Sequence, residues 1–446
     1  MEREDVIYSE HSTQLDIPED FKFGAGVSGM QVEGDDYNSD WSDNSLFGRT
    51  AQKRGREASQ NTDYGNNQGK ALPQELWDRI KSQAQDPENY KRGRSLGWEE
   101  GSYTEDLDIA QDLGLHMVRT SVERSRIEPQ EGNFDPKAIL HYRRFIEDCR
   151  KRGIEPVITL FHFSNPLWLS KKGGFESEGV AQNFADYVEK LLRAIDINGD
   201  IKHIIILNEP DIYIFMGYLY GGWPPEKKKS FVSALKVRRN LIEAHKRSYQ
   251  KIKSYDESSL VSTSVNLVHV EPKSRSIQDR LGAELFRKLN NIFLPSIKGD
   301  IDFIALSQYM HNVKKGINPG SGNFQNKDSE PRSDLGWYLN PESIYHVLMY
   351  LKKYGLPIMV SENGLADSED RQRPWFLRES IYQVMRAIND GADVRAYLHW
   401  SLVDNIELHE GKWPRFGLIG FDYNTGERTI RWSAREYKRI IASRKV

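Results

Sequence analysis

The stretch HIIILNEP, at residues 203–210, places the carboxylate of Glu209 directly after an apolar run. A second stretch, PIMVSENG at residues 357–364, repeats the arrangement with Glu362. A short apolar run bounded by a polar turn is typical of a buried strand in a parallel sheet. Because a carboxylate is costly to bury without a task or a partner, the two stretches predict parallel strands whose carboxyl ends carry functional side chains.

Similar apolar runs recur on both sides of these stretches along the chain, and helical patterns separate most of them. The runs begin near Phe21, His116, Pro156, Ile201, Leu260, Ile301, Pro357 and Val394. The helical patterns cover residues 103–113, 136–152, 180–198, 230–255, 279–293, 341–354, 374–390 and 433–441. Alternating strands and helices indicate a parallel sheet, and eight strands match a closed (β/α)8 TIM barrel. We therefore expect an α/β fold in which residues 1–446 form one such barrel.

Two polar segments are expected to be long inserted loops of this barrel. They are residues 35–101, with a short helix near 73–83, and residues 314–333. The rival architecture is an open doubly wound sheet, which usually carries a nucleotide-binding glycine loop after its first strand. Gly24, Gly26 and Gly29 have the spacing G-x-G-x-x-G, but no helical pattern follows them. The closed barrel is therefore the preferred prediction.

Composition and charge exclude several classes of protein. The chain has 62 Lys and Arg against 65 Asp and Glu, a net charge of −3, so a chain-wide basic surface for nucleic acid is absent. No run of 18 apolar residues occurs, so no membrane span is expected. Cys149 is the only cysteine, which rules out a disulfide within the chain, and its helical neighbours predict a buried thiol. With no signal-peptide pattern at the charged N-terminus, we expect a cytoplasmic protein.

The two carboxylates suggest a chemistry. Strands four and seven lie on opposite arcs of an eight-stranded barrel, so Glu209 and Glu362 can face each other across its mouth. Two carboxyl groups that flank a bond are the minimum equipment for glycoside hydrolysis. A single such Glu would more often belong to a structural ion pair, but two, each followed by a turn, favour catalysis. The 11 histidines show no metal-binding motif, so neither a metal nor a cofactor is expected.

The same stretches resemble glycoside hydrolase family one, the β-glycosidases. Asn208-Glu209-Pro210 and Glu362-Asn363-Gly364 are similar to the acid/base and nucleophile motifs of that family. Further similar segments are FKFGAGVSGMQVEG, VRTSVERSRIEP, TLFHFSNPLW, DFIALSQYMH, YLHWSLVDNIELHEG and PRFGLIGFDYNTGERTIRWSA. DPEN, SDLGWYLNPE and ENGLADSEDRQRP resemble the archaeal branch of the family. The resemblance spans about Phe21 to Ile441.

The resemblance implies a retaining mechanism, a double displacement through a covalent glycosyl-enzyme intermediate. Glu362 would be the nucleophile, and Glu209 would act first as the acid and then as the base. Arg119 and Tyr309 would contact Glu362 and support its role as the nucleophile. The two carboxyl groups would lie about 5–5.5 Å apart. The implied sugar contacts are Gln31, His162, Asn208, Trp400, Glu407 and Phe416.

Four residues depart from the family pattern. They are Arg124 in place of a Trp, Ser307 and Gln308 in place of Asn-Tyr, and Leu408 in place of a Trp. The first three are expected to affect packing around the site. Leu408 has no donor for a sugar hydroxyl, so we expect a roomier site on that side, unless Trp413 or Lys412 replaces the lost donor.

The expected substrates are small β-glycosides or oligosaccharides with a terminal non-reducing glucosyl, galactosyl or fucosyl residue. A 6-phospho-β-glycosidase is a second hypothesis, although Glu407 would repel a phosphate, and Pro414 and Phe416 occupy two positions of its phosphate pocket. A catalytically dead carbohydrate-binding barrel is a third, although both carboxylates are present. The sequence leaves open the sugar preference, the aglycone and whether the chain forms a homo-oligomer.

Overall fold

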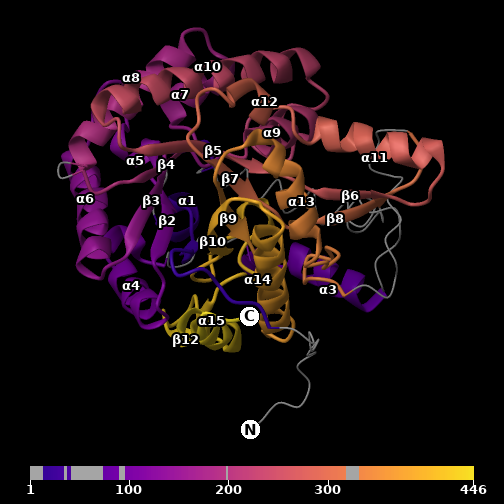
Figure 1. Ribbon diagram of the computed structural model, residues 1–446. Helices are drawn as coiled ribbons and strands as arrows, with labels where there is room; N and C mark the ends of the chain where they lie inside the picture. The colour runs from indigo at the N-terminus through magenta and orange to yellow at the C-terminus, as the bar shows by residue number, and fades with distance from the viewer. Residues whose placement is uncertain (1–13, 35–37, 42–73, 90–95, 197–198, 318–330) are drawn as a thin grey trace.

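The computed structural model describes residues 14–34, 38–41, 74–89, 96–196, 199–317 and 331–446. Eight parallel strands close into a barrel at its centre (Figure 1). Their order around the barrel follows the chain, and the last strand pairs with the first. They are β1 (Lys22–Gly26), β2 (Met117–Ser121), β3 (Glu155–Thr159), β4 (His203–Asn208), β5 (Leu260–Asn266), β7 (Ile304–Ser307), β9 (Ile358–Asn363) and β10 (Val394–Trp400). The predicted (β/α)8 TIM barrel is confirmed.

Helices surround the barrel, and most lie within a few residues of the predicted ranges (Figure 1). The longer ones are α4 (Tyr103–Asp112), α6 (Pro136–Lys151), α8 (Val180–Ile195), α10 (Phe231–Tyr255), α11 (Ile277–Leu289), α13 (Ser343–Leu351), α14 (Arg373–Asn389) and α15 (Trp432–Ser443). The helix predicted at 279–293 ends instead at Leu289, and a short helix, α12 (Leu294–Ile297), follows. No helix in the described ranges is both long and apolar enough to cross a lipid bilayer.

Helix α6 illustrates how the sequence sets these elements. Asp135 caps the helix by accepting a hydrogen bond from the backbone N–H of Lys137, and Pro136 occupies the first turn, where its missing N–H costs nothing. The buried face of the helix includes Tyr142 and Cys149. Cys149 is fully buried and unpaired, so the predicted core thiol is confirmed.

The inward face of the barrel changes character along the strands. Apolar side chains form one buried cluster in the interior: Met117, Val157, Ile205, Phe303, Ala305, Met359, Ala396 and Leu398. Side chains two residues apart on a strand share a face, so Arg119 shares a face with Met117, and Ser307 with Ala305. The interior is therefore polar at the carboxyl ends of the strands, where a barrel carries its site, and apolar farther toward their amino ends.

The glycines of β1 serve packing between strands. A Cβ on Gly24 would lie 2.4 Å from the carbonyl oxygen of Met117 on β2, a distance that real side chains do not adopt. One helical turn, α1 (Gly29–Val32), follows the glycines, and it is too short for the helix of a dinucleotide site. The closed barrel thus removes the doubly wound alternative.

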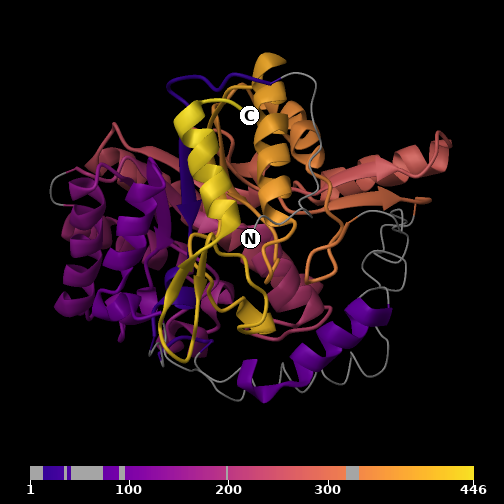
Figure 2. The ribbon, with the colours of Figure 1, turned by 90° about the horizontal axis from the view of Figure 1, so that it is seen from below.

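Two small sheets lie outside the barrel and were not predicted. Strand β6 (His269–Pro272) pairs in parallel with β8 (His311–Lys314), and β11 (Ile419–Phe421) pairs antiparallel with β12 (Arg428–Ile430). The β6–β8 ribbon follows the carboxyl ends of β5 and β7, and it projects from the side of the barrel beside α11 (Figure 2).

The predicted inserted loops are only partly within the described residues. The short helix expected near 73–83 is present as α3 (Gln74–Gln85). Residues 35–37, 42–73 and 90–95 of the first loop, and 318–330 of the second, lie outside the described residues.

Candidate active site

Glu362 is the residue before the last of β9, and two donors from other segments contact its carboxylate. Arg119, on β2, forms an ion pair through Nη1 with Oε1 of Glu362, and the hydroxyl of Tyr309 donates to Oε2 at 2.7 Å. Burial and the charges of Glu362 and Glu209 raise the pKa of Tyr309 well above its usual value, so the phenol keeps its proton. Both oxygens of Glu362 therefore receive a hydrogen bond, one of them from a fixed positive charge.

Arg119 is itself held in place by the barrel. The residue is fully buried, its Nε donates to Oγ1 of Thr159 on β3 at 2.9 Å, and its Nη2 donates to Oδ1 of Asn208 on β4 at 2.6 Å. The guanidinium thus joins three strands to Glu362 on a fourth. Such a fork leaves the side chain little freedom to turn away from the carboxylate.

Glu209 follows β4 in surroundings of a different kind. Burial, and then the charge of Glu362, raise the pKa of Glu209 to about 8, against the opposing effect of hydrogen bonds with Asn266 and Ser307. The carboxyl group is therefore protonated at neutral pH. Its backbone has φ 41° and ψ 58°, a left-handed conformation that costs a non-glycine residue about 1–3 kcal/mol. The fold maintains this strain at the point where β4 turns into helix α9 (Pro210–Ile214).

The predicted sugar-contact residues His162, Asn208 and Trp400 come together next to Arg119. Nδ2 of Asn208 lies 3.2 Å from Nε2 of His162, whose ring stacks on Trp400 with centroids 5.9 Å apart. Burial and the charge of Arg119 lower the pKa of His162 well below its usual value, so its imidazole is neutral. Nδ1 of His162 is buried and finds no hydrogen-bond partner in the described part of the chain.

Gln31, on the short helix α1, and Glu407, in the segment after β10, approach the same region. Nε2 of Gln31, on α1, donates to Oδ1 of Asn405 at 3.1 Å and to the carbonyl oxygen of Ile406 at 2.7 Å, which ties it to the segment that carries Glu407. Oε1 of Gln31 is buried and has no partner among the described residues. The charge of Glu407 contributes to the raised pKa of Tyr309, so Glu407 lies near that tyrosine.

Aromatic rings form one wall beside these groups. Phe416 contacts Tyr309 and Trp337, with ring centroids 6.4 Å and 6.2 Å apart. Trp400, Trp413 and Phe416 pack in one buried cluster, with Tyr309 and Trp337 against it. Trp337, in the stretch SDLGWYLNPE, is the ring of this wall that was not predicted as a site residue or donor. A tryptophan in a loop gives no signal of what it faces.

Ser307 and Gln308, two of the departures, have definite contacts. Ser307 bonds with Glu209, and its Oγ lies 2.8 Å from Oγ of Ser264, so it touches the carboxyl group rather than only packing near it. Nε2 of Gln308 donates to Oγ of Ser343 at 2.8 Å, and the carbonyl oxygen of Gln308 accepts from Nδ2 of Asn363 at 2.6 Å. Gln308 thereby ties β9 to the segment after β7.

Arg124, the third departure, is buried and packs against two aromatic rings. It pairs with Glu128 at 2.7 Å, and its guanidinium lies over the rings of Tyr187 and Trp168 at 4.4 Å and 5.2 Å. This residue therefore takes part in packing with Glu128, Tyr187 and Trp168.

Leu408 is buried in the main hydrophobic core. Of the two side chains suggested as replacement donors, Lys412 places its Nζ 5.0 Å from the ring centre of Tyr423. Trp413 has a buried indole N–H with no hydrogen-bond partner within the described ranges. Because Trp413 also packs with Trp400, it is the better candidate for the donor.

Nearly the whole chain matches the model of one known protein family. Residues 13–296 and 294–446 match the model of glycosyl hydrolase family 1. The chain belongs to this family. Among its family 1 relatives is a beta-galactosidase from Sulfolobus acidocaldarius, 30% identical over 96% of each chain. A 1,4-beta-D-glucan glucohydrolase from Thermotoga neapolitana is 31% identical, over 76% of this chain and 85% of the relative.

Solved structures agree with the family assignment. A beta-glycosidase from Pyrococcus horikoshii superposes with a TM-score of 0.80 at 32% identity, covering 97% of this chain and 96% of the other. The predicted resemblance to family 1, with archaeal relatives, is confirmed. This family 1 chain is therefore a glycoside hydrolase of the β-glycosidase type.

A group of side chains with metal-ligand chemistry lies elsewhere. Within the described ranges, His269, Glu271 and His311 gather closely enough to hold an ion, and they belong to β6 and β8 rather than to the barrel. No sequence motif points to this group, because its members come from two strands that are far apart in the chain. The expectation that the reaction needs no metal is untouched by it.

Proposed function

We propose that this family 1 enzyme is a retaining β-glycosidase that removes terminal non-reducing β-D-glucosyl, galactosyl or fucosyl residues. The observation that carries the proposal is the inequality of the two carboxyl groups. Glu362 receives hydrogen bonds from Arg119 and Tyr309, whereas Glu209 has a pKa of about 8 and holds a proton. One group is equipped as a nucleophile and the other as an acid.

In the first step, a carboxylate oxygen of Glu362 bonds to the anomeric carbon while the bond from that carbon to the leaving oxygen breaks. The proton of Glu209 passes to the leaving oxygen, so the aglycone departs as an alcohol. The product is a glycosyl ester of Glu362 and an ionised Glu209. Arg119 and Tyr309, each bonded to one oxygen of Glu362, hold the carboxylate in place during this step.

In the second step, Glu209 accepts a proton from water, and the water oxygen displaces Glu362 from the anomeric carbon. The change of role follows from electrostatics. The charge of Glu362 is one cause of the raised pKa of Glu209, and this charge is absent in the ester. The pKa of Glu209 therefore falls when it must act as a base, and it rises again when the free carboxylate returns. Two inversions at one carbon give retention.

The sugar is held by the predicted contact residues. Asn208 bonds the 2-hydroxyl, Trp400 forms the stacking floor, and Gln31, His162 and Glu407 hold the remaining hydroxyls. Two buried polar atoms support this, because Oε1 of Gln31 and Nδ1 of His162 have no partner within the described residues, and buried polar atoms normally have one. The names of the relatives, a beta-galactosidase and a glucan glucohydrolase, support acceptance of both epimers.

The test is hydrolysis of nitrophenyl β-D-glucoside, galactoside, fucoside and 6-phosphoglucoside, with the first product observed by NMR before mutarotation. We expect turnover of the unphosphorylated sugars and a β-anomer as the first product. An α-anomer would overturn the retaining mechanism. Exclusive turnover of the phosphorylated substrate would identify a 6-phospho-β-glycosidase, and failure on every β-glycoside would favour a dead barrel.

A further inference from the structure

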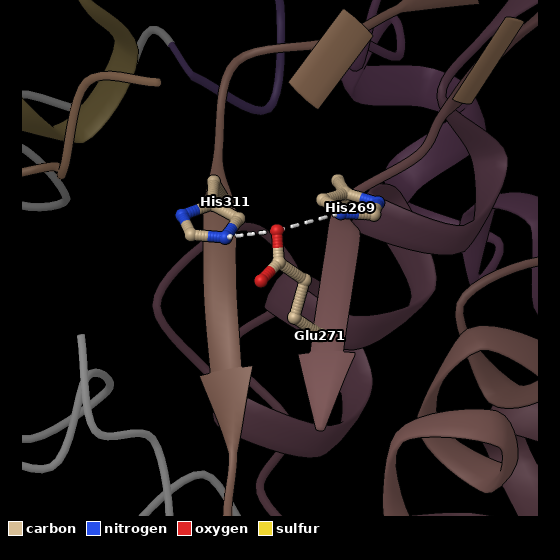
Figure 3. Close-up of side chains that lie close together, drawn as sticks. All are labelled: His269, Glu271 and His311. Atoms are coloured by element: carbon tan, nitrogen blue, oxygen red, sulfur yellow. Dashed lines mark hydrogen bonds and ion pairs between the residues drawn. The ribbon is translucent and has the colours of Figure 1, made fainter. Parts of the chain in front are cut away.

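Three side chains with metal-binding chemistry converge on the β6–β8 ribbon, outside the barrel (Figure 3). His269 and Glu271 are two residues apart on β6, and His311 is the register partner of His269 on β8. Oε1 of Glu271 lies 3.2 Å from Nε2 of His269 and 3.3 Å from Nε2 of His311. Figure 3 shows the carboxylate oxygen between the two imidazole rings.

These distances suit a shared metal ion. Bonds of about 2.0–2.2 Å from Zn²⁺ to imidazole nitrogen and carboxylate oxygen place neighbouring ligand atoms roughly 3.0–3.6 Å apart. The ligand atoms of the group all lie within 4.8 Å of one another. Small rotations of the side chains would therefore complete the geometry, without any movement of the paired backbones.

The surroundings hold the two imidazoles in place and leave the carboxylate open to solvent. The side chains of His269 and His311 are 11% and 3% exposed, whereas Glu271 is 46% exposed, so the group is fixed on one side and open to solvent on the other. The ring of His346 stacks on His269 with centroids 4.5 Å apart, which fixes the plane of that imidazole. A side chain that is already oriented loses less conformational entropy when it binds an ion.

We propose that His269, Glu271 and His311 bind one divalent transition-metal ion, and that Zn²⁺ is the ion that this ligand set suits. Two imidazoles and one carboxylate are a known three-ligand set for zinc, with water in the remaining position. The ion ties β6 to β8 and takes no part in the hydrolysis.

The place of the clamp gives it a consequence for the active site. Strand β8 begins two residues after Tyr309, which donates to Glu362, and β6 begins three residues after Asn266, which bonds with Glu209. An ion that cross-links the two strands therefore steadies both of these segments. Its binding stabilises the folded chain, because the unfolded chain has no such site.

The experiment uses the full chain, freed of metal with a chelator and titrated with Zn²⁺ by calorimetry and thermal unfolding. We expect one ion per chain and a melting temperature that rises by a few degrees at saturation. Glu271→Gln keeps the size of the half-exposed side chain and should weaken binding by at least about 10-fold. Glu155→Gln is the matched control, because Glu155 pairs with a single histidine, His203, and it should bind Zn²⁺ as the unmodified chain does.

The proposal is overturned if the unmodified chain does not bind Zn²⁺, or if Glu271→Gln binds it equally well. Should Glu271→Gln fail to fold, anomalous scattering at the zinc edge from crystals of the unmodified chain soaked in Zn²⁺ decides. A peak between His269, Glu271 and His311 supports the site, and peaks elsewhere alone overturn it.

Discussion

The ends of β4 and β9 carry the same residue in unlike surroundings. At the end of β9, Glu362 meets the guanidinium of Arg119 and the hydroxyl of Tyr309. At the end of β4, Glu209 is buried beside the negative charge of Glu362, which raises its pKa to about 8. Position on the barrel brings a carboxyl group to the site, whereas its neighbours set its electrostatic surroundings.

The difference originates in the polar layer above the apolar barrel interior. The guanidinium of Arg119 donates to Glu362, Asn208 and Thr159. For Glu209 it exerts only a weak opposing effect on the pKa, the last of the causes that act there. The buried guanidinium of Arg119 thus pairs directly with Glu362, whereas burial and the charge of Glu362 dominate the pKa of Glu209.

Replacement of Glu362 by glycine should have the largest effect. We expect Glu362→Gly to lower kcat on activated β-glycosides by about 10⁴-fold or more, because no covalent intermediate can form. Added azide or formate should restore part of the turnover by occupying the space of the missing carboxylate, and it should give a product of inverted, α configuration. Kinetics with dinitrophenyl β-glucoside and NMR of the product measure both. Near-normal activity would show that Glu362 is not the nucleophile.

Replacement of Glu209 by alanine should depend on the leaving group. General acid catalysis contributes about 10²- to 10⁴-fold, so Glu209→Ala should slow poor leaving groups by that range and dinitrophenyl glycosides far less. The basic limb of the pH profile should also flatten. In the unmodified enzyme, kcat/KM should fall as the pH rises through about 8, because Glu209 then loses its proton. Equal losses for all leaving groups would instead indicate a structural role for Glu209.

Replacement of Tyr309 by phenylalanine removes one of the two donors to Glu362. A hydrogen bond to a charged group is worth about 1.5–3 kcal/mol, so we expect Tyr309→Phe to lower kcat/KM roughly 10- to 150-fold. Tyr345→Phe is the matched control, because Tyr345 makes a similar bond of 2.8 Å to Asp390 at the surface. Steady-state kinetics give kcat/KM of the two variants. An equal effect in both would show that Tyr309 has no specific role in the site.

A smaller effect is expected at Trp413, whose buried N–H has no partner among the described residues. If this N–H bonds a sugar hydroxyl, Trp413→Phe should lower kcat/KM by roughly 2- to 13-fold. This range corresponds to the net value of one neutral hydrogen bond, about 0.5–1.5 kcal/mol. The loss should differ between glucoside, galactoside and fucoside. Leu408→Trp should lower all three together, because Leu408 is already buried in the core. A gain for one sugar in Leu408→Trp would contradict this and indicate free space at Leu408.

The smallest effect is expected at Ser307, whose hydrogen bond with Glu209 lowers the pKa of that carboxyl group. Ser307→Ala should therefore raise the pKa of Glu209, and the basic limb of kcat/KM should move to higher pH by less than about one unit. Ser262→Ala is a suitable control, because Ser262 bonds the carbonyl oxygen of Phe303 away from the carboxyl pair. A shift to lower pH in Ser307→Ala would contradict the assigned bond.

The barrel was predictable from the sequence because its signals are local. Each strand is a short apolar run, each helix has its own period, and Glu209 and Glu362 stand directly after such runs. Strands β6 and β8, with the sequences HVEP and HNVK, are too short and polar to give that signal. They pair only because the barrel brings the ends of β5 and β7 together.

The environment of each site residue was harder to predict than its position. The contact of Ser307 with Glu209 and the place of Trp337 beside Phe416 arise from segments that meet only in the folded chain. Likewise, His269 and His311 become neighbours through strand register, which no motif search detects. Long-range pairing of this kind leaves no periodicity in the sequence.

The assignment of roles to Glu362 and Glu209 is tested most directly by trapping the glycosyl-enzyme. A 2-deoxy-2-fluoroglucosyl fluoride slows both steps, while its good leaving group lets the first one proceed. After digestion, mass spectrometry locates the ester. We predict one label per chain, on Glu362. A label on Glu209, or the absence of any label in an enzyme whose first product is the α-anomer, would contradict the division of labour between the two carboxyl groups.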